Sequence, residues 1–491
     1  MVASAVILGS KLPQGEPERS LLATAKLKRA LGFRDLILFY VASGLSLRWI
    51  ATAAASGPSA IVVWLTALMG FFVPLAACVL DLSSRYPAEG GLYVWTREAF
   101  GPFPAFISAW TYWMSNLPYF PSVLFFAASS LLYLGAPMQQ LAESQLYFLV
   151  FTVVMLTLIT ALNVVGLATG KWLNNLGAIG GMIPAVVLIA LGLFSFVRFG
   201  SATHFTLGAM VPRPGMKNLI FLSTIFFAFG GCEAGSFMGD EIREPRRVIP
   251  RSLFVAGLIL GFGYIAGTLS MLVALPVDRI SGLGGFMTAV DFLARRVGMG
   301  ILVVPIAALV AVSNIGAASA YLSSTARLPF VAGVHRYLPE AFGRIHPRFG
   351  TPHVAIISYG AAGILFGLLG QAGTTIRGAY DMLVSMAVIT YFIPYLFLFA
   401  SAIRLQVQPL PAEAFRLPGG KRTIIPLACV GLLSTACTIV LSLFPAEDDA
   451  HPRATFLKVV IMTIVLLGAG LAIYRSSNRV QARDRSERNT A

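Results

Sequence analysis

Three ionisable side chains, Arg48, Glu233 and Asp381, lie inside long apolar stretches of this sequence. Such stretches dominate the 491-residue chain, which is 57% hydrophobic and 12% charged, whereas a soluble globular protein carries about 25% charged residues. We therefore expect an integral membrane protein. A charge at membrane depth costs about 3 kcal/mol or more and marks a path for substrate or ions by default. These three residues are the first candidates for function.

The two acids each allow a functional and a structural interpretation. Glu233 could act as a protonation or gating switch, because burial disfavours a charged carboxyl and a nearby cation favours it. Alternatively, Glu233 could be a fixed acid that holds irregular backbone. Asp381 could gate the outer side together with Arg377, one helical turn earlier, or the two could form a pair along a helix surface.

Arg48 has three alternative roles. It could form a buried ion pair with Glu233, bind a substrate carboxylate bidentately, or extend to the outer surface. A permanent positive charge near a binding site would repel cationic substrates. This residue therefore favours neutral or acidic amino acids over polyamines.

Metal, nucleotide and nucleic-acid chemistry lack their usual patterns in the sequence. It contains neither a His-Glu-x-x-His pattern nor a Walker-type loop, and its four cysteines lie in apolar segments. We expect no enzyme activity, no cofactor and no metal site. The net charge of +15 has a simple origin in the Lys and Arg of cytoplasmic loops, so we expect no nucleic-acid partner.

The hydrophobic pattern predicts an all-α fold with twelve membrane helices, each needing about 20 mostly apolar residues. Pro118 and Pro121 predict a kink in the third helix. The predicted spans are 34–56, 59–82, 103–134, 145–166, 175–199, 217–239, 250–275, 301–332, 353–371, 378–403, 423–445 and 454–474.

Twelve spans place both termini on one side, which the basic residues predict to be the cytoplasm. With that orientation, 26 of the 36 Lys and Arg residues lie inside, nine lie outside and Arg48 lies within a span. We expect a bacterial-type inner membrane, with membrane lipid as a partner. The expected divisions are a basic cytoplasmic tail (1–33), a core of ten helices (34–404), two further helices (405–474) and a second basic cytoplasmic tail (475–491).

Small residues predict a break in the first and the sixth span. The candidates are Ser43, Gly44, Leu45 and Ser46 in the first span and Phe229, Gly230, Gly231 and Cys232 in the sixth. Paired interruptions in two corresponding halves point to the central site of a transporter. Free N–H groups at half-helix N-termini suit a carboxylate and free carbonyls suit an ammonium, so an α-amino acid fits both. Glycines that only allow close helix packing are the alternative.

Several stretches resemble motifs of the amino acid–polyamine–organocation (APC) superfamily, in the same order. The stretch RYPAEGGLYVW at 85–95 resembles R-[FY]-P-x-x-G-G-x-Y, and FGGCE at 229–233 resembles F-x-G-[FY]-E. Further along, EPRRVIPR at 244–251 resembles N-P-x-R-x-I-P-[RK], and residues 324–327 and 346–352 resemble two later motifs. The resemblance covers about residues 30–474. Many members carry G-S-G-[IV] in the first helix, where this chain has SGLS at 43–46, followed by Arg48.

The resemblance implies the LeuT-type fold, a five-plus-five inverted repeat with discontinuous helices 1 and 6 and two additional helices. It also implies secondary transport of amino acids or related amines by alternating access, through symport or exchange. The aromatic residue that closes over the substrate would be Phe227, with Phe226 as the near alternative. In sodium-coupled relatives, hydroxyls on helix eight form a cation site, which Ser323 and Ser324 with Asn314 could supply here. The coupling ion would be a proton or sodium. The alternative function is a sensor on the same fold that does not transport.

Overall fold

The computed structural model describes most of the chain between residues 32 and 490. The described residues are 32–86, 91–165, 167–212, 223–233, 242, 244–325, 337, 340–344, 346–349, 351–409, 417–444 and 452–490, without the side chains of 42–43, 167–179, 245–246, 323–325, 340, 343 and 478–490. Within these ranges the structure is an all-helical membrane protein.

Ten of the described helices are long and apolar enough to cross a membrane. Each overlaps one of the predicted spans. They are Gly57–Arg85, Pro102–Leu134, Gln145–Val165, Gly180–Phe199, Arg247–Ala274, Gly300–Leu322, His353–Gln371, Ile376–Val407, Lys421–Leu441 and Pro452–Ser477.

The two predicted spans that are missing from these ten are the first and the sixth. The first is divided into pieces of 12 and 8 residues by Leu45 and Ser46. The sixth is helical at 223–228 and irregular from Phe229 to Gly231, and residues 234–241 lie outside the described part. Both spans were predicted to be interrupted, and the described part of each contains residues outside a helix.

The helices that position the site are identified by their bounds. They are α1 (Phe33–Gly44), α2 (Leu47–Ala54), α3 (Ala60–Ala67), α4 (Val73–Arg85), α5 (Gly91–Phe100), α6 (Pro102–Met114), α7 (Asn116–Leu131), α9 (Gln145–Val165), α10 (Leu167–Phe199), α13 (Pro245–Ala274), α14 (Gly285–Arg296), α15 (Val303–Thr325), α17 (His353–Gln371), α18 (Ile376–Arg404), α19 (Lys421–Leu441) and α20 (Pro452–Thr490).

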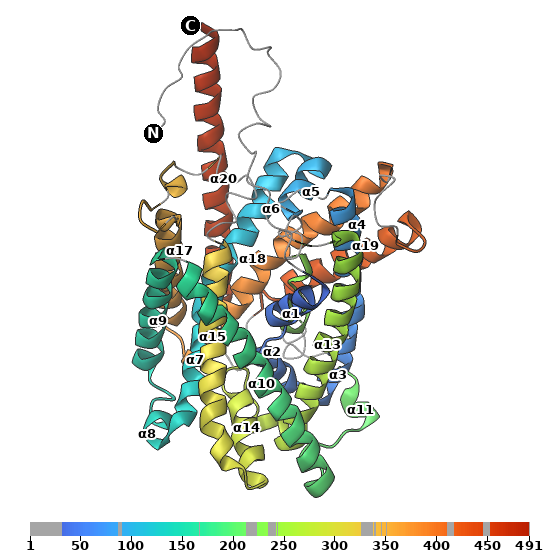
Figure 1. Cartoon of the computed structure of the whole chain (residues 1–491), viewed down its shortest axis with the longest axis vertical. Helices are drawn as coiled ribbons and strands as arrows, with labels where there is room; N and C mark the ends of the chain where they lie inside the picture. Colours follow the sequence, from blue (N-terminus) through green and yellow to red (C-terminus); the bar gives the residue numbers. More distant parts are fainter. Residues whose placement is uncertain are drawn as a thin grey trace, which may run out of the picture.

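The short helices α1 and α2 lie inside the bundle, surrounded by longer ones (Figure 1). Helix α13 packs along both α1 and α2, α15 packs against α7 and α10, and α18 packs against α6, α7 and α19. Helix α20 continues beyond the predicted span 454–474 and projects from one end of the bundle (Figure 1). The broken helix is therefore enclosed by protein, which is where irregular backbone at membrane depth is tolerated.

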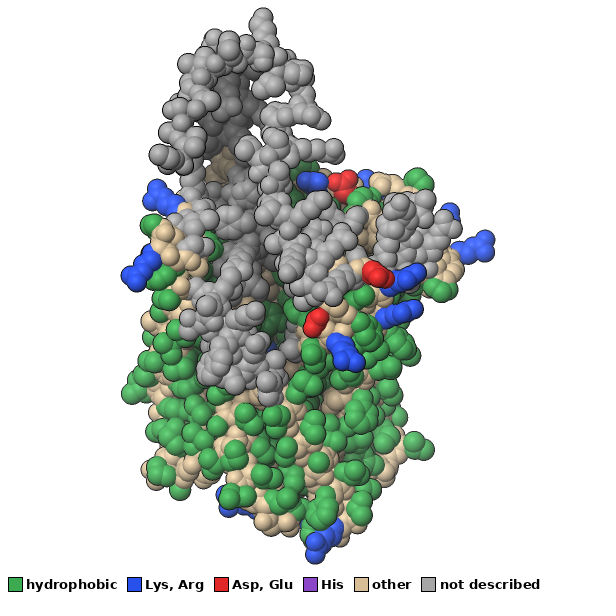
Figure 2. Space-filling view, in the orientation of Figure 1, with side chains coloured by type: hydrophobic (Ala, Val, Ile, Leu, Met, Phe, Trp, Pro, Cys, Tyr) green, Lys and Arg blue, Asp and Glu red, His purple; other side chains and the backbone are tan. Residues whose placement is uncertain are grey.

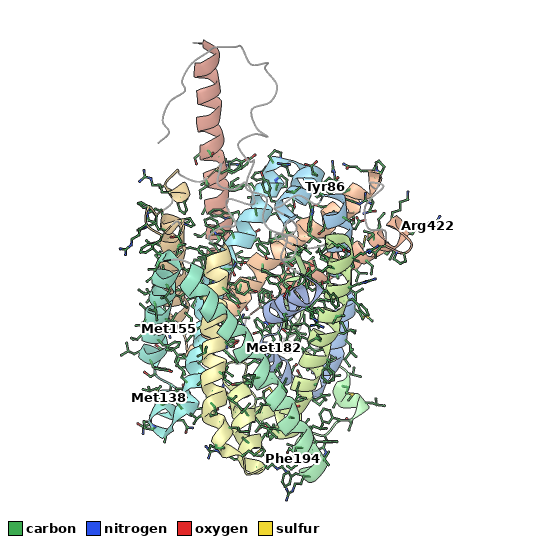
Figure 3. The ribbon with its side chains drawn as sticks, in the orientation of Figure 1. Tyr86, Met138, Met155, Met182, Phe194 and Arg422 are labelled. Carbon is green, nitrogen blue, oxygen red and sulfur yellow. The ribbon has the colours of Figure 1, made fainter. Side chains whose placement is uncertain are left out.

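Polar and apolar side chains separate along the long axis of the molecule. Hydrophobic side chains cover most of the middle of the visible face, and the coloured charges lie toward its two ends (Figure 2). Tyr86 and Arg422 mark the end from which α20 projects, and Met138 and Phe194 lie toward the opposite end (Figure 3). This distribution fits a molecule whose middle belt faces lipid.

The third predicted span is broken at a single residue. Helix α6 ends at Met114, Ser115 forms a turn, and α7 begins at Asn116. Pro118 has no N–H to donate to the Met114 carbonyl, four residues earlier, so the helical ladder cannot pass through this point. The turn lies where the kink was predicted, and it places two polar residues, Ser115 and Asn116, in the interior of the bundle.

The RYP stretch ties α4 to the segment that follows α18. Arg85 donates to Asp81 Oδ2 at 2.8 Å in a buried ion pair and to Gln406 Oε1 at 2.9 Å. Gln406 in turn donates to Asp81 Oδ2 at 2.6 Å. Because both ions are buried, each needs the other, and this cluster fixes the two helix ends together.

Candidate functional site

The break between α1 and α2 consists of two extended residues. Leu45 has φ −78° and ψ 107°, and Ser46 has φ −122° and ψ 124°. The amide of Leu45 still donates to the Val41 carbonyl at 2.8 Å, so α1 ends in regular geometry. The extended backbone then interrupts the helical ladder, leaving carbonyls of α1 and amides of α2 without helical partners.

The second break depends on glycine. Gly231 has φ +107°, a conformation that side chains with a Cβ rarely adopt. A Cβ at Gly230 would lie 2.6 Å from Tyr391 Cε1, so a larger residue here would require the Tyr391 ring to move. The Gly231 amide donates to Glu233 Oε2 at 3.2 Å and faces the Tyr395 hydroxyl at 3.3 Å. Side chains thus replace the helical partners that the break removes.

Tyr264 on α13 connects the two breaks. Its hydroxyl donates to the Gly44 carbonyl, accepts from the Ser46 amide at 3.2 Å, and lies 3.3 Å from the Ala228 carbonyl oxygen. The phenol ring stacks on Trp64, with ring centroids 4.3 Å apart. One buried hydroxyl therefore bonds to backbone groups on both sides of the first break and lies against the carbonyl that precedes the second.

A small cavity lies between the breaks. Its volume is about 50 Å³, enough for a few water molecules. It is lined by Gly44, Ser46, Arg48, Trp49, Ser115, Asn116, Tyr119, Phe227, Ala228, Gly230, Tyr321 and Tyr391. The lining combines both breaks with the turn between α6 and α7, α15 and α18, so parts of the chain that are distant in sequence meet around one space.

Arg48 is buried at the edge of this cavity, with 1% of its surface exposed. Its Cζ lies 4.1 Å from the ring centroid of Trp49 and 4.7 Å from that of Tyr119. Nη1 donates to Ser122 Oγ at 3.0 Å, and Nε has no hydrogen-bond partner within the described part of the chain. Aromatic faces, rather than an acid, stabilise the positive charge.

Two of the three alternatives for Arg48 do not fit this geometry. No ion pair of the described residues includes Arg48, so it is not paired with Glu233. Its burial also excludes an extension to the outer surface in this conformation. Contact with a substrate carboxylate stays a prediction.

Glu233 is fully buried directly after the second break. Its Oε1 accepts from the hydroxyls of Tyr112 and Tyr391, each at 2.9 Å, and its Oε2 accepts from the Gly231 amide. Tyr391 belongs both to this set of donors and to the cavity lining. The carboxylate therefore holds the broken backbone and is one side chain away from the cavity.

Phe227 lies between the two charged groups. Its ring contacts Trp49 edge to face, with centroids 5.4 Å apart, and Tyr391 in the same manner at 5.0 Å. The alternative residue, Phe226, is buried and packs against Phe71 with centroids 6.2 Å apart. Of the two, Phe227 has the position from which an aromatic ring could close over a ligand.

Only some of the predicted substrate-binding residues line the cavity. Gly44, Ser46, Arg48, Phe227 and Gly230 do. Four residues are absent from the described lining: Leu45, Phe229, Gly231 and Cys232. Phe229 instead packs against Trp64 and Tyr264. The side chain of Ser43 lies outside the described residues.

The structure gives fewer contacts for the residues of the predicted gating and cation sites. Asp381 lies on α18, ten residues before Tyr391, which is about 15 Å along a helix, and the cavity lining does not include it. Asn314 donates to the Val310 carbonyl of its own helix at 2.7 Å. The side chains of Ser323 and Ser324 lie outside the described residues. The roles of these four residues stay predictions.

The residues that the sequence interpretation missed are mainly tyrosines. Tyr112, Tyr264 and Tyr391 each place a hydroxyl on the broken backbone or on the acid beside it. In the sequence they stand in apolar helices, where a tyrosine usually packs. A usable signal for the third interruption in the bundle was the polar pair Ser115 and Asn116, which lies two residues before Pro118.

The fold defines an integral membrane protein with several spans and a small buried cavity between two helix breaks. A family model for amino acid permeases matches residues 31–467. The chain therefore belongs to the amino acid permease family, within the APC superfamily, as the resemblance predicted.

Relatives and one solved structure extend this comparison. An uncharacterized transporter of Legionella pneumophila is 26% identical over 450 residues, covering 91% of this chain and 95% of the relative. A probable agmatine/putrescine antiporter of Lactococcus lactis is 22% identical, and the match covers 88% of this chain and 91% of the relative. The polyamine transporter RMV1 of Arabidopsis thaliana is 24% identical, and the match covers 92% of this chain and 87% of the relative.

The solved manganese transporter of Eremococcus coleocola has the LeuT fold and matches with a TM-score of 0.58 at 11% identity, covering 94% of this chain and 99% of the other. That likeness shows the fold alone. Within the described residues, no group of three His, Cys, Asp or Glu side chains could hold a metal ion.

Proposed function

We propose that this permease is a secondary transporter of neutral or acidic amino acids and works by alternating access through the cavity between the two breaks. The observation that carries the substrate class is Arg48, a permanent cation in the cavity wall whose Nε lacks a partner among the described residues. A substrate carboxylate would provide that partner, and the N-terminus of α2 would support it.

Organic amines are the second candidate. Four relatives are named for agmatine, putrescine or polyamines, and Glu233 could attract an ammonium through a rearranged Tyr391. Against this, Arg48 directly borders the cavity, and a fixed positive charge opposes cationic ligands. Amino acids therefore remain the preferred class.

The proposed architecture is that of twelve spans in a five-plus-five inverted repeat followed by two further helices. Residues 34–404 form the transport core, 405–474 form the last two helices, and both tails are cytoplasmic in a bacterial-type inner membrane. The 26-to-9 distribution of basic residues supports this orientation. Because the cavity holds only a few waters, substrate entry requires the surrounding helices to move apart.

Flux in proteoliposomes tests the function. Radiolabelled alanine, glutamate, putrescine and agmatine are each offered to the purified full-length protein, with a proton or sodium gradient and with internal substrate for exchange. We expect uptake of at least one amino acid and none of the two amines. Uptake of putrescine or agmatine at low concentration would overturn the substrate class. Specific binding without any flux would instead favour the sensor.

A further inference from the structure

The surroundings of Arg48 have the composition of a binding site for a free cation. Trp49 and Tyr119 present ring faces to the guanidinium at 4.1 and 4.7 Å, and Ser122 accepts one hydrogen bond at 3.0 Å. Aromatic faces with a small number of polar acceptors are how proteins bind ammonium and guanidinium ligands. Here the cation is attached to the protein's own backbone.

A structural arginine at this depth would be expected to have an acid as its partner. A buried charge without one is costly, yet no ion pair of the described residues includes Arg48. Glu233, fully buried near the same cavity, accepts its hydrogen bonds from phenols and an amide. The Arg48 site thus stabilises a positive charge without neutralising it.

The location of this site connects it with the transport cavity. Arg48, Trp49 and Tyr119 all belong to the cavity lining, so the guanidinium fills space that is continuous with the place proposed for substrate. Removal of the side chain beyond Cβ would enlarge the cavity and leave the two rings and the Ser122 hydroxyl facing an empty volume.

We propose that Arg48 is a tethered occupant of a cation subsite, and that its side chain makes the permease reject substrates with a guanidinium or alkylammonium group. Without it, the cage of Trp49, Tyr119 and Ser122 binds small guanidinium cations. This inference takes one element from the proposed function, namely that the substrate binds in this cavity. The cage itself is defined by the contacts of Arg48.

The test measures binding of methylguanidinium to full-length protein in detergent, by thermal shift and by titration of tryptophan fluorescence. We expect Arg48→Ala to bind methylguanidinium about tenfold or more tightly than the wild type, because two ring faces become available. Adding Trp49→Leu or Tyr119→Leu to this variant should abolish the gain.

Arg296→Ala is the matched control. Arg296 also lies over two rings, Phe199 at 4.6 Å and Phe292 at 5.7 Å, but in a separate groove formed with α10 and α14. This variant should show no gain. Arg48→Gln serves as a second variant that removes the charge and keeps a side chain of similar length, and we expect a smaller gain of about threefold from it.

The inference would be overturned if neither Arg48 variant binds methylguanidinium more tightly than the wild type. It would also be overturned if Arg296→Ala gains as much affinity as Arg48→Ala. If Arg48→Ala does not fold, the result for Arg48→Gln decides. The binding assay needs no gradient and no transport. Its failure would leave the proposed amino acid flux standing, and absence of flux would leave the cage intact.

Discussion

The surroundings of Arg48 and of Glu233 stabilise opposite buried charges by different means. Arg48 lies between two ring faces with one hydroxyl acceptor, whereas Glu233 accepts directed hydrogen bonds from two phenols and an amide. Ring faces tolerate any cation of suitable size, but directed donors fit one carboxylate. Under the proposed function, the first region would therefore control which charge can enter, whereas the second holds the broken backbone in place.

The two charges also differ in whether they can change. A guanidinium stays protonated at all physiological pH values, while a carboxylate can take up a proton. Phe227 contacts both Trp49 and Tyr391. A shift of this ring would therefore change the packing beside Arg48 and beside Glu233. Under the proposed function, Arg48 would select substrates by its fixed charge, and Glu233 would couple its protonation to transport.

The largest expected effect comes from Glu233→Leu. The substitution removes the acceptor of two phenol hydroxyls and one of the two acceptors of the Gly231 amide, at about 1–3 kcal/mol for each group left unsatisfied. We expect the Tm of the purified protein to fall by several degrees and substrate flux to be lost. Asp291→Leu is the control, because that acid pairs with the exposed Arg295. An unchanged Tm in Glu233→Leu would show that the acid does not hold the break.

Glu233→Gln separates the charge from the hydrogen bonds. The amide oxygen can still accept from Tyr112 and Tyr391, but the side chain cannot titrate. We expect a folded protein whose uptake is reduced and depends less on pH than that of the wild type, measured in proteoliposomes over a pH series. A pH profile identical to that of the wild type would remove Glu233 from coupling and leave it a structural acid.

Arg48→Met should behave in the opposite manner to Glu233→Leu. The methionine keeps an apolar stem between Trp49 and Tyr119 and removes a buried charge, which is often neutral or stabilising. We expect an unchanged or higher Tm, together with amino acid uptake lowered about tenfold because a charge-assisted contact is lost. A fall in Tm as large as that of Glu233→Leu would contradict the contrast between the two regions.

The smallest effects concern Tyr119. Its ring face, 4.7 Å from the Arg48 Cζ, carries the interaction, so Tyr119→Leu should destabilise the protein by about 0.5–2 kcal/mol. Tyr119→Phe keeps the face and should leave the Tm nearly unchanged. Equal Tm losses in both variants would show that the hydroxyl, not the ring, is the important group.

The sequence predicted where the helices break because the causes are local. Gly230 and Gly231 stand out in an apolar segment, and Pro118 removes one particular helical hydrogen bond. The partners of the exposed backbone could not be predicted in the same way. Tyr264 is separated from Gly44 by 220 residues, and only the packing of α13 along α1 brings them together. One of the three alternatives for Arg48, the ion pair with Glu233, does not fit the structure for a similar reason, since opposite charges suggest an attraction and do not reveal the rings of Trp49 and Tyr119 beside the guanidinium.

Tyr264 has a mechanical consequence for the molecule. Its hydroxyl contacts the last residues of α1 and the end of the helical turn at 223–228 at the same time. A displacement of either segment relative to the other would pull on this oxygen, so small motions of the two are correlated as long as it stays bonded. Separating the end of α1 from the helical turn at 223–228 would therefore require the contacts of this hydroxyl to break first.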